Sequence, residues 1–320
     1  MGALALHRMI QINAPTDWRQ RLGKTQTRMP GMRLLRLLII AAAMLTAAPA
    51  TAADDPPRLQ EEVWALPLPV PTIAYVVRPV GDGPFPLAIM NHGVSMDPVQ
   101  RVFFPLVEFR DAAMWFARRG YMVVAPSGPG YGAAAVESPE AGLFSLFFSK
   151  VGKCTNPNFR DAGLAKAQLS LWIIEYMSTL KRIIPNDVIV IGQSAGGWGS
   201  IALSSVNPPP VKAIITFAAG RGGRVDGKPN NNCAPDRLVE ATGEFGRTSR
   251  VPLLMMYIEN DTYFGPELSK RMHAAFTAAG GNAEYHLFPP HGSDGHFFVD
   301  TADAVPIWSP VVGAFLDKHR

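Results

Sequence analysis

The sequence has few cysteines, few charged residues and a single long apolar stretch, which lies near the N-terminus. Two of its 320 residues are cysteines and 18% are charged. No CxxC or HxxxH spacing occurs, so the common zinc motifs are excluded and we predict no metal site. A composition that is 48% hydrophobic, without internal repeats or low-complexity linkers, indicates a globular chain.

The positive net charge does not indicate a nucleic-acid partner. The formal charge is +4, but residues 1–52 hold seven basic residues and one acid. The rest of the chain therefore carries 23 basic and 25 acidic residues, a net charge of −2. Because the excess lies in the N-terminal segment, we predict no nucleic-acid partner, and no membrane partner once that segment is removed.

The N-terminal segment has the three parts of a secretory signal peptide. Arg33 and Arg36 carry positive charge, Leu37–Ala48 is an apolar core, and Ala50–Ala52 has the small-x-small pattern that signal peptidase needs. We predict cleavage at the end of that pattern or one residue later, and a mature protein that is periplasmic or secreted. An uncleaved membrane anchor is the alternative, although the apolar core is shorter than the ~20 residues that span a bilayer.

The chain is therefore divided into a leader with its signal peptide, residues 1–52, and a single domain, residues 53–320. Met32 directly precedes the charged part of the signal and is an alternative start. Export would place Cys154 and Cys233 in an oxidising compartment. Both lie in polar, loop-like sequence, so we predict a disulfide between them.

Short apolar segments alternate with helical patterns along the predicted domain. Strands are expected at 72–78, 86–90, 121–125, 187–191, 211–217, 251–258 and 284–288. Helices are expected at 105–119, 159–184, 198–205, 266–279 and 305–317. This alternation predicts an α/β fold with a mostly parallel sheet and helices on both faces. In such sheets ligands bind beyond the carboxyl ends of the strands.

The segment Gly192–Gly197, with the sequence Gly-Gln-Ser-Ala-Gly-Gly, links an expected strand to an expected helix. In that context Gly-x-Ser-x-Gly is typical of a nucleophile elbow, a turn so tight that the backbone of the serine is strained. Gly192 and Gly196 stand where a Cβ atom would clash. Ser194 is therefore the candidate nucleophile, at the carboxyl edge of the sheet and at the start of a helix.

A serine nucleophile needs an imidazole base, and the base needs a carboxylate that holds its tautomer. Asp261 follows the expected strand 251–258 and is the candidate acid, with Glu259 as its competitor. His296 lies in a loop after the last expected strand and is the candidate base, with His291 as its competitor. Along the chain the serine comes first, the acid second and the histidine last, which is one of the orders in which catalytic triads occur.

Backbone amides must stabilise the oxyanion of a tetrahedral intermediate. One candidate donor is Ala195, directly after the nucleophile, and the other is Val94, after the turn Asn91–Gly93. His92 is interpreted as a structural histidine that pins this loop. The aromatic segment 143–148 is a candidate lid or acyl pocket, although such clusters are more often plain core.

These motifs resemble those of the α/β-hydrolases and, within them, of the dienelactone hydrolase-like branch. The resemblance covers nearly all of residues 60–320, and its carriers are Asn91–Gly93, Gly192–Gly197, Glu259–Asp261 and Asp294–His296. It implies a mainly parallel, eight-stranded sheet and a triad of Ser194, Asp261 and His296, and it favours His296 over His291. Dienelactone hydrolases proper use a cysteine nucleophile. The serine of this chain points instead to serine esterases of the same fold.

The sequence therefore predicts an exported serine hydrolase that cleaves small-molecule carboxylic esters through an acyl-enzyme and needs no cofactor. Three other functions stay open. One is a serine peptidase of the same fold that acts on short peptides, and another is a non-catalytic binding protein on a hydrolase scaffold. The third is an exported polyester depolymerase or polysaccharide deacetylase, which would need a surface cleft or a binding module. A complete triad argues against the binding protein, because binding alone does not require all three groups in order.

Overall fold

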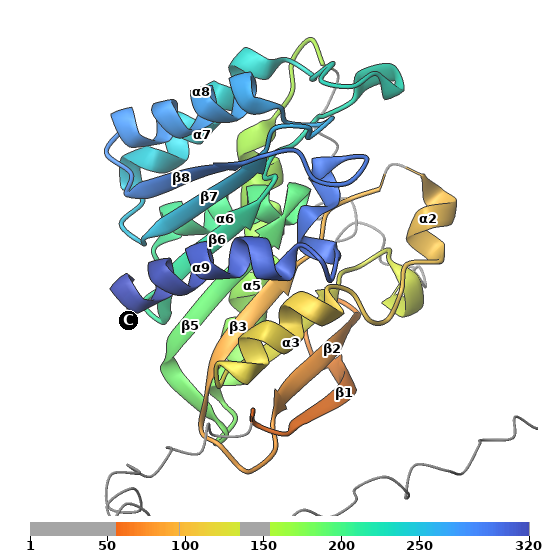
Figure 1. The fold of residues 1–320 in the computed structure, drawn as a ribbon, viewed down its shortest axis with the longest axis vertical. Coiled ribbons are helices and arrows are strands. Elements are labelled where there is room, and N and C mark those ends of the chain that lie inside the picture. The colour runs from red at the N-terminus through yellow and green to blue at the C-terminus, as the bar shows by residue number, and fades with distance from the viewer. Residues whose placement is uncertain (1–55, 96, 135–153, 320) are drawn as a thin grey trace, which may run out of the picture. The chain divides into compact units, whose positions relative to one another are not determined.

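The sheet is the framework of the fold, and the site is built at one edge of it. The computed structural model describes residues 56–95, 97–134 and 154–319. Within these residues eight strands form one sheet in the order β1-β2-β4-β3-β5-β6-β7-β8 (Figure 1). The strands are β1 (Leu59–Leu66), β2 (Thr72–Pro79), β3 (Phe85–Asn91), β4 (Met122–Ser127), β5 (Ile183–Gln193), β6 (Val211–Phe217), β7 (Leu253–Ile258) and β8 (Ala283–Phe288). β1 and β4 each pair antiparallel with β2, and the other neighbours pair in parallel, which confirms the expected mostly parallel sheet.

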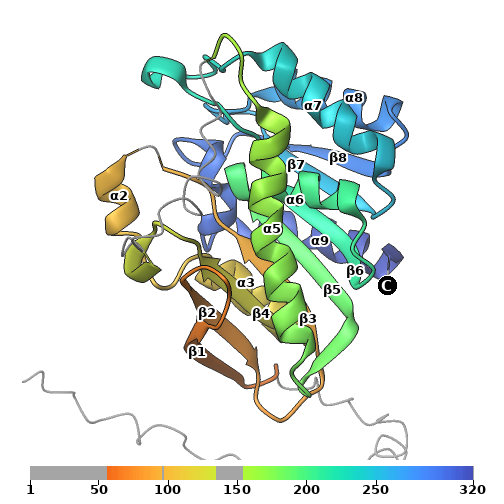
Figure 2. The same cartoon turned by 180° about the vertical axis from the view of Figure 1, so that it is seen from behind.

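Helices cover both faces of this sheet. The longer helices are α3 (Arg110–Arg118), α5 (Phe159–Ser178), α6 (Ser194–Val206), α7 (Pro235–Thr248), α8 (Pro266–Ala278) and α9 (Val305–His319). α3 and α9 share one apolar cluster with the sheet and lie in front of it in Figure 1. α5, α6, α7 and α8 share the cluster on the opposite face, where α5 lies in front in Figure 2. The expected α/β fold class is confirmed.

Strand β5 shows why the central strands are apolar along their whole length. Val188 and Val190 pack in the cluster with α5 and α6. Ile189 and Ile191 pack in the cluster with α3 and α9. Successive side chains of a strand point to opposite faces, and here both faces are covered by helices. A central strand therefore has no polar face, and the apolar run leads straight into the candidate nucleophile.

Two of the longer elements of the structure, β1 and α7, are not expected from the sequence. β1 is an edge strand in which Glu61 and Glu62 interrupt the apolar pattern. α7 follows Ala234, which has a left-handed backbone with φ of 42°. Neither element has the continuous apolar character by which the central strands can be recognised.

Two expected helices are shorter in the structure. The helix expected at 105–119 begins only at Arg110, because Phe109 has a left-handed backbone with φ of 58°. A five-residue helix, α2 (Pro98–Val102), precedes it. The helix expected at 159–184 ends at Ser178, and a turn over the next residues brings the chain back into the sheet at β5.

The expected disulfide joins Cys154 and Cys233, which are 79 residues apart in sequence. It ties the segment before α5 to the loop before α7. The amide of Cys233 also donates to the carbonyl of Gly222 at 2.7 Å. The loop before α7 is therefore held at Cys233 by a disulfide and by a backbone hydrogen bond. The candidate lid segment 143–148 lies outside the described residues. No helix of the described chain is long and apolar enough to cross a membrane.

Candidate active site

Ser194 stands at the sharp turn between β5 and α6. Its backbone has φ of 53°, a left-handed conformation that a serine adopts only when its surroundings enforce it. A Cβ on Gly192 would lie 2.5 Å from the carbonyl oxygen of Gly196. A Cβ on Gly196 would overlap the carbonyl oxygen of Asn91 and lie 2.6 Å from that of His92. The turn therefore requires glycine at both positions, as the motif indicates.

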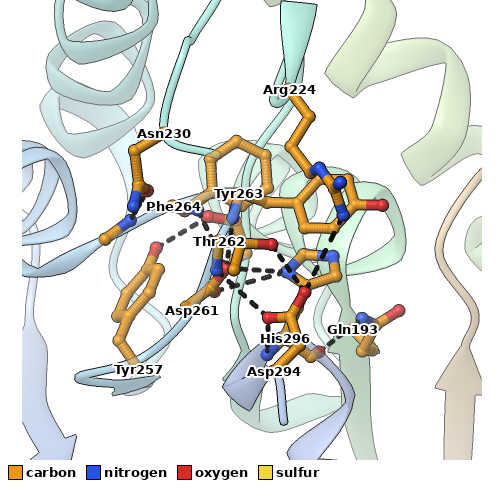
Figure 3. A network of polar contacts seen from close by, with 12 residues as sticks. Gln193, Arg224, Asn230, Tyr257, Asp261, Thr262, Tyr263, Phe264, Asp294 and His296 are labelled. Atoms are coloured by element: carbon orange, nitrogen blue, oxygen red, sulfur yellow. Dashed lines mark hydrogen bonds and ion pairs between the residues drawn. The ribbon is translucent and has the colours of Figure 1, made fainter. Parts of the chain in front are cut away.

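Asp261 and His296 come together beyond the carboxyl ends of β7 and β8, respectively. Nδ1 of His296 lies 3.1 Å from Oδ1 and 3.3 Å from Oδ2 of Asp261 (Figure 3). Their relative exposures are 3% and 1%, so water does not compete for this contact. Oδ1 of Asp261 also accepts from the backbone amides of Tyr263 at 2.7 Å and Phe264 at 3.0 Å. An ionised carboxylate that binds Nδ1–H leaves Nε2 of His296 able to accept a proton.

A second carboxylate, that of Asp294, ties the base loop to the acid loop. Its Oδ1 accepts from the amides of His296 at 3.0 Å and Thr262 at 3.1 Å. Its Oδ2 accepts from Oγ1 of Thr262 at 2.5 Å. Burial raises the pKa of Asp294, but the bonds from Thr262 and His296 outweigh it and the net pKa is lowered. Sequence reasoning missed this role, although Asp294 belongs to the Asp-Gly-His motif that carried the resemblance.

The elbow and the base loop meet through Gln193. Its Nε2 donates to the carbonyl oxygen of His296 at 2.9 Å. Between the described side chains of Ser194 and His296 themselves the structure shows no hydrogen bond. Catalytic hydrogen bonds are often long in unliganded enzymes and tighten with substrate. The structure thus places all three candidate triad residues in one buried neighbourhood and joins two of them directly.

The loop after β3 passes close to the candidate nucleophile. A Cβ on Gly93 would lie 3.0 Å from Cβ of Ser194, so the backbone approaches the serine at this point. Val94 follows directly. Ala195 belongs to the first turn of α6, where amides have no partner within the helix. The two candidate oxyanion donors therefore belong to segments that flank Ser194.

His92 holds this loop in place. Its Nδ1 lies 2.6 Å from the carbonyl oxygen of Gly93 and must donate there, because Nε2 accepts from the amide of Gly128 at 3.3 Å. Burial, together with the charge of Lys166, holds the pKa of His92 well below its usual value, while the bond to Gly93 acts in the opposite direction. His92 is therefore neutral and structural.

Two basic residues, Lys166 and Arg221, lie near this loop. Nζ of Lys166 and Nε2 of His92 each lie 3.9 Å from the position that a Cβ on Gly128 would occupy. Burial lowers the pKa of Lys166 to about 8, with a smaller contribution from the charge of Arg221. Burial also lowers the pKa of Arg221, although Tyr131 opposes that effect. Two basic side chains, Lys166 and Arg221, thus act on each other close to His92.

The competing candidates lie elsewhere. His291 is 3.3 Å from Oγ1 of Thr301 and 3.4 Å from Oδ2 of Asp303, not beside Asp261. Glu259 is exposed to solvent. The geometry therefore supports Asp261 and His296 over both. Among the residues that the structure describes, no group of His, Cys, Asp and Glu side chains is placed to hold a metal ion.

The chain is similar to one protein family and to several solved structures. The model of the dienelactone hydrolase family matches residues 103–307 of the chain. A crystal structure assigned to a dienelactone hydrolase of Klebsiella pneumoniae is 19% identical, with a TM-score of 0.54 over 81% of this chain and 99% of that one. A CIB-like hydrolase of Thermoplasma acidophilum is 18% identical, with a TM-score of 0.52 over 81% of this chain and 98% of that one.

A longer protein shares the same fold. The acylaminoacyl peptidase of Pyrococcus horikoshii is 14% identical, with a TM-score of 0.57 over 82% of this chain and 42% of that one. None of the curated proteins compared with the chain matches it. At these identities the likeness to solved structures shows the α/β-hydrolase fold alone.

Proposed function

The chain belongs to the dienelactone hydrolase family, and from that premise we propose that it is an exported serine hydrolase that cleaves carboxylic esters. The observation that carries the proposal is the contact of 3.1 Å between Nδ1 of His296 and Asp261, next to a serine with φ of 53°. A buried carboxylate bound to imidazole beside a strained serine is an arrangement suited to acyl transfer. A non-catalytic binding protein requires neither the carboxylate–imidazole contact nor the strained serine.

The mechanism follows from the positions of these groups. Nε2 of His296 takes the proton of the Ser194 hydroxyl as its oxygen attacks the ester carbonyl. The amides of Val94 and Ala195 hold the resulting oxyanion. His296 then gives its proton to the departing alcohol. The acyl group stays bound to Ser194 as the acyl-enzyme. Water then attacks the acyl carbon while His296 takes its proton. The bond between the acyl carbon and Oγ of Ser194 breaks, His296 returns the proton to that oxygen, and the acid is released.

Asp261 has two roles in this sequence of steps. It holds the proton on Nδ1 of His296, so that Nε2 is the basic nitrogen, and it stabilises the imidazolium that forms. Neither a metal nor an organic cofactor takes part in any step. The reaction therefore needs only groups of the chain itself, the ester and water.

Export of the mature protein is part of the proposal. The signal-like segment at the N-terminus supports it, and so does the disulfide between Cys154 and Cys233, since such bonds persist in oxidising compartments. Periplasmic extraction followed by mass spectrometry of the N-terminus tests this point. An N-terminus at Ala53 or Asp54 is expected, and a protein retained in the cytoplasm would contradict it.

A serine peptidase is the second candidate. The likeness to the acylaminoacyl peptidase favours it, although the chain spans 42% of that protein. The two reactions share the same triad and differ in the leaving group, an alcohol or an amine. Matched p-nitrophenyl esters and p-nitroanilides of the same acyl group separate them, and we expect the ester to be hydrolysed faster.

Labelling with a fluorophosphonate tests the nucleophile. We expect the wild-type protein to be labelled and Ser194→Ala not to be. Ser205→Ala is the matched control, because this serine lies at the far end of α6, where its Oγ donates to the carbonyl of Ala202 at 2.7 Å. Labelling of Ser194→Ala would remove Ser194 from its role. A wild-type protein that neither reacts nor hydrolyses esters would favour the binding protein.

A further inference from the structure

The side chain of Tyr263 lies flat against the imidazole of His296. The two ring centroids are 4.0 Å apart and the rings are inclined by 25°. The guanidinium carbon of Arg224 lies 5.0 Å from the centroid of the same tyrosine ring, and in Figure 3 Tyr263 lies between the other two side chains. We propose that Tyr263 is a positioning residue that holds the imidazole of His296 in its working plane, and that Arg224 braces Tyr263 there.

His296 needs this support because its contact with Asp261 leaves the tilt of the ring open. Nδ1 lies 3.1 Å from one carboxylate oxygen and 3.3 Å from the other, so neither oxygen alone directs the ring. A ring held at Nδ1 can rock, and Nε2, on the far side, then moves away from Ser194. Small misplacements of reacting groups can cost ~100-fold in rate. A flat aromatic ring against one face blocks that motion.

The backbone of Tyr263 is fixed by the same carboxylate that binds His296. Its amide donates to Oδ1 of Asp261 at 2.7 Å. Its carbonyl oxygen accepts from Nδ2 of Asn232 at 2.5 Å. The acid therefore sets the positions of both rings at once, and a shift of one is accompanied by a shift of the other.

Arg224 reaches Tyr263 from a loop that is bound to the acid loop. Its backbone is left-handed, with φ of 57°. Its guanidinium donates to the carbonyl of Gly227 at 3.0 Å, and Nη1 lies 4.0 Å from Oδ2 of Asp294. Farther along the loop, the amide of Asn230 donates to the carbonyl of Thr262 at 2.7 Å. Arg224 thus contacts the tyrosine ring and also pairs with the carboxylate that caps the His296 loop.

Charged groups and an aromatic face surround the ring on which an imidazolium forms during acyl transfer. The carboxylates of Asp261 and Asp294 attract a cation, and so does the face of the Tyr263 ring. Arg224 opposes them, but its side chain is 33% exposed and it is paired with Asp294. The imidazolium that forms during acyl transfer therefore gains from the tyrosine ring as well as from the acid.

The inference rests on the proposed role of His296 as the base, and kinetics on a p-nitrophenyl ester test it. We expect Tyr263→Leu to lower kcat by about 30-fold with KM changed less than about threefold, because the ring orients the base rather than the substrate. Tyr263→Phe keeps the ring and should restore most of kcat. Tyr285→Leu is the matched control, since this half-buried tyrosine stacks on Tyr257 at 5.8 Å, away from His296.

The pH profile gives a readout that a purely structural role would not change. The acidic limb of kcat/KM reports protonation of the catalytic base in the free enzyme. Loss of the ring face removes a contact that stabilises the imidazolium, so Tyr263→Leu should move that limb to lower pH. Tyr263→Phe should return it to its wild-type position.

Arg224→Met tests the brace. We expect it to lower kcat about threefold in the wild-type background and to have no further effect in Tyr263→Leu, because the ring that it holds is then gone. Additive effects of the two substitutions would overturn the brace. The arginine is partly exposed, so Arg224→Met can also be measured alone if circular dichroism shows that Tyr263→Leu is unfolded. An unchanged kcat for Arg224→Met would then overturn the brace.

The failure of this inference is distinct from the failure of the proposed function. If Ser194 is labelled and esters are hydrolysed, but Tyr263→Leu is as active as Tyr263→Phe with an unmoved acidic limb, the positioning role is wrong and the function stands. If the wild-type protein neither reacts with fluorophosphonate nor hydrolyses esters, the function and the inference fail together.

Discussion

Gly196→Ala, at the elbow, should lower the free energy of unfolding and the reactivity of Ser194 far more than a glycine-to-alanine substitution in another helix. A Cβ on Gly196 would overlap the carbonyl oxygen of Asn91 and lie 2.6 Å from the carbonyl oxygen of His92. Both are backbone atoms at the end of β3, where Asn91 is held in register against Gly192. They cannot swing aside as a flexible side chain could, so α6 and the loop after β3 must separate.

The matched substitution is Gly243→Ala, within α7. A Cβ there would meet Ala275 at 3.4 Å and beyond, which is ordinary van der Waals contact. Alanine in place of a helical glycine stabilises by about 0.5–1 kcal/mol where the conformation is compatible. Gly196→Ala should instead destabilise by about 3 kcal/mol, the upper end for overpacking of a rigid site.

Urea unfolding followed by tryptophan fluorescence and circular dichroism measures both effects. With unchanged slopes, the midpoint of Gly196→Ala should fall by about 1 M and that of Gly243→Ala should rise slightly. Fluorophosphonate labelling of Gly196→Ala should slow by about 100-fold, because the loop that carries Val94 shifts away from Ser194. Equal midpoints and equal labelling rates for the two variants would refute the reasoning.

Three further outcomes are expected from the same geometry. Asp261→Asn should lower kcat by about 10⁴-fold with KM nearly unchanged, while Glu259→Gln, at an exposed position, should leave kcat at its wild-type value; the reverse result would reassign the acid. Replacing Cys154 and Cys233 together by serine should lower the free energy of unfolding by about 4 kcal/mol, as expected for a bridge across 79 residues, and an unchanged urea midpoint would argue against this. Lys166→Met should stabilise by ~1 kcal/mol at pH 7, because burial lowers the pKa of this half-buried lysine to about 8 and a charged lysine there destabilises the fold. That gain should shrink as the pH rises from about 8 towards 10.5, since the lysine is then neutral in the fold while the unfolded chain still binds the proton; a constant gain would show that charge is not the cause.

The features that the sequence determined by itself depend on residues close together in the chain. Alternating apolar segments and helical patterns predict the α/β class because they report which faces each element must bury. The elbow is readable because the turn is local: a Cβ on Gly192 would meet the carbonyl oxygen of Gly196, four residues along the chain. The demand for glycine at Gly196 is tertiary, because the clashing carbonyls belong to Asn91 and His92. The order of Ser194, Asp261 and His296 follows from where each expected strand ends, since the carboxyl ends of parallel strands meet at one edge of the sheet.

The tertiary structure decided what depends on distant segments. It separates His296 from His291, because only the former reaches Asp261, which is 35 residues away in the chain. It also brings Arg224 over Tyr263 and Asp294 onto Thr262, contacts that no local pattern encodes. The physical reason is that backbone propensity and periodicity act between near neighbours. The placement of one loop on another is set by the packing of the whole sheet and by a few hydrogen bonds between segments far apart in sequence.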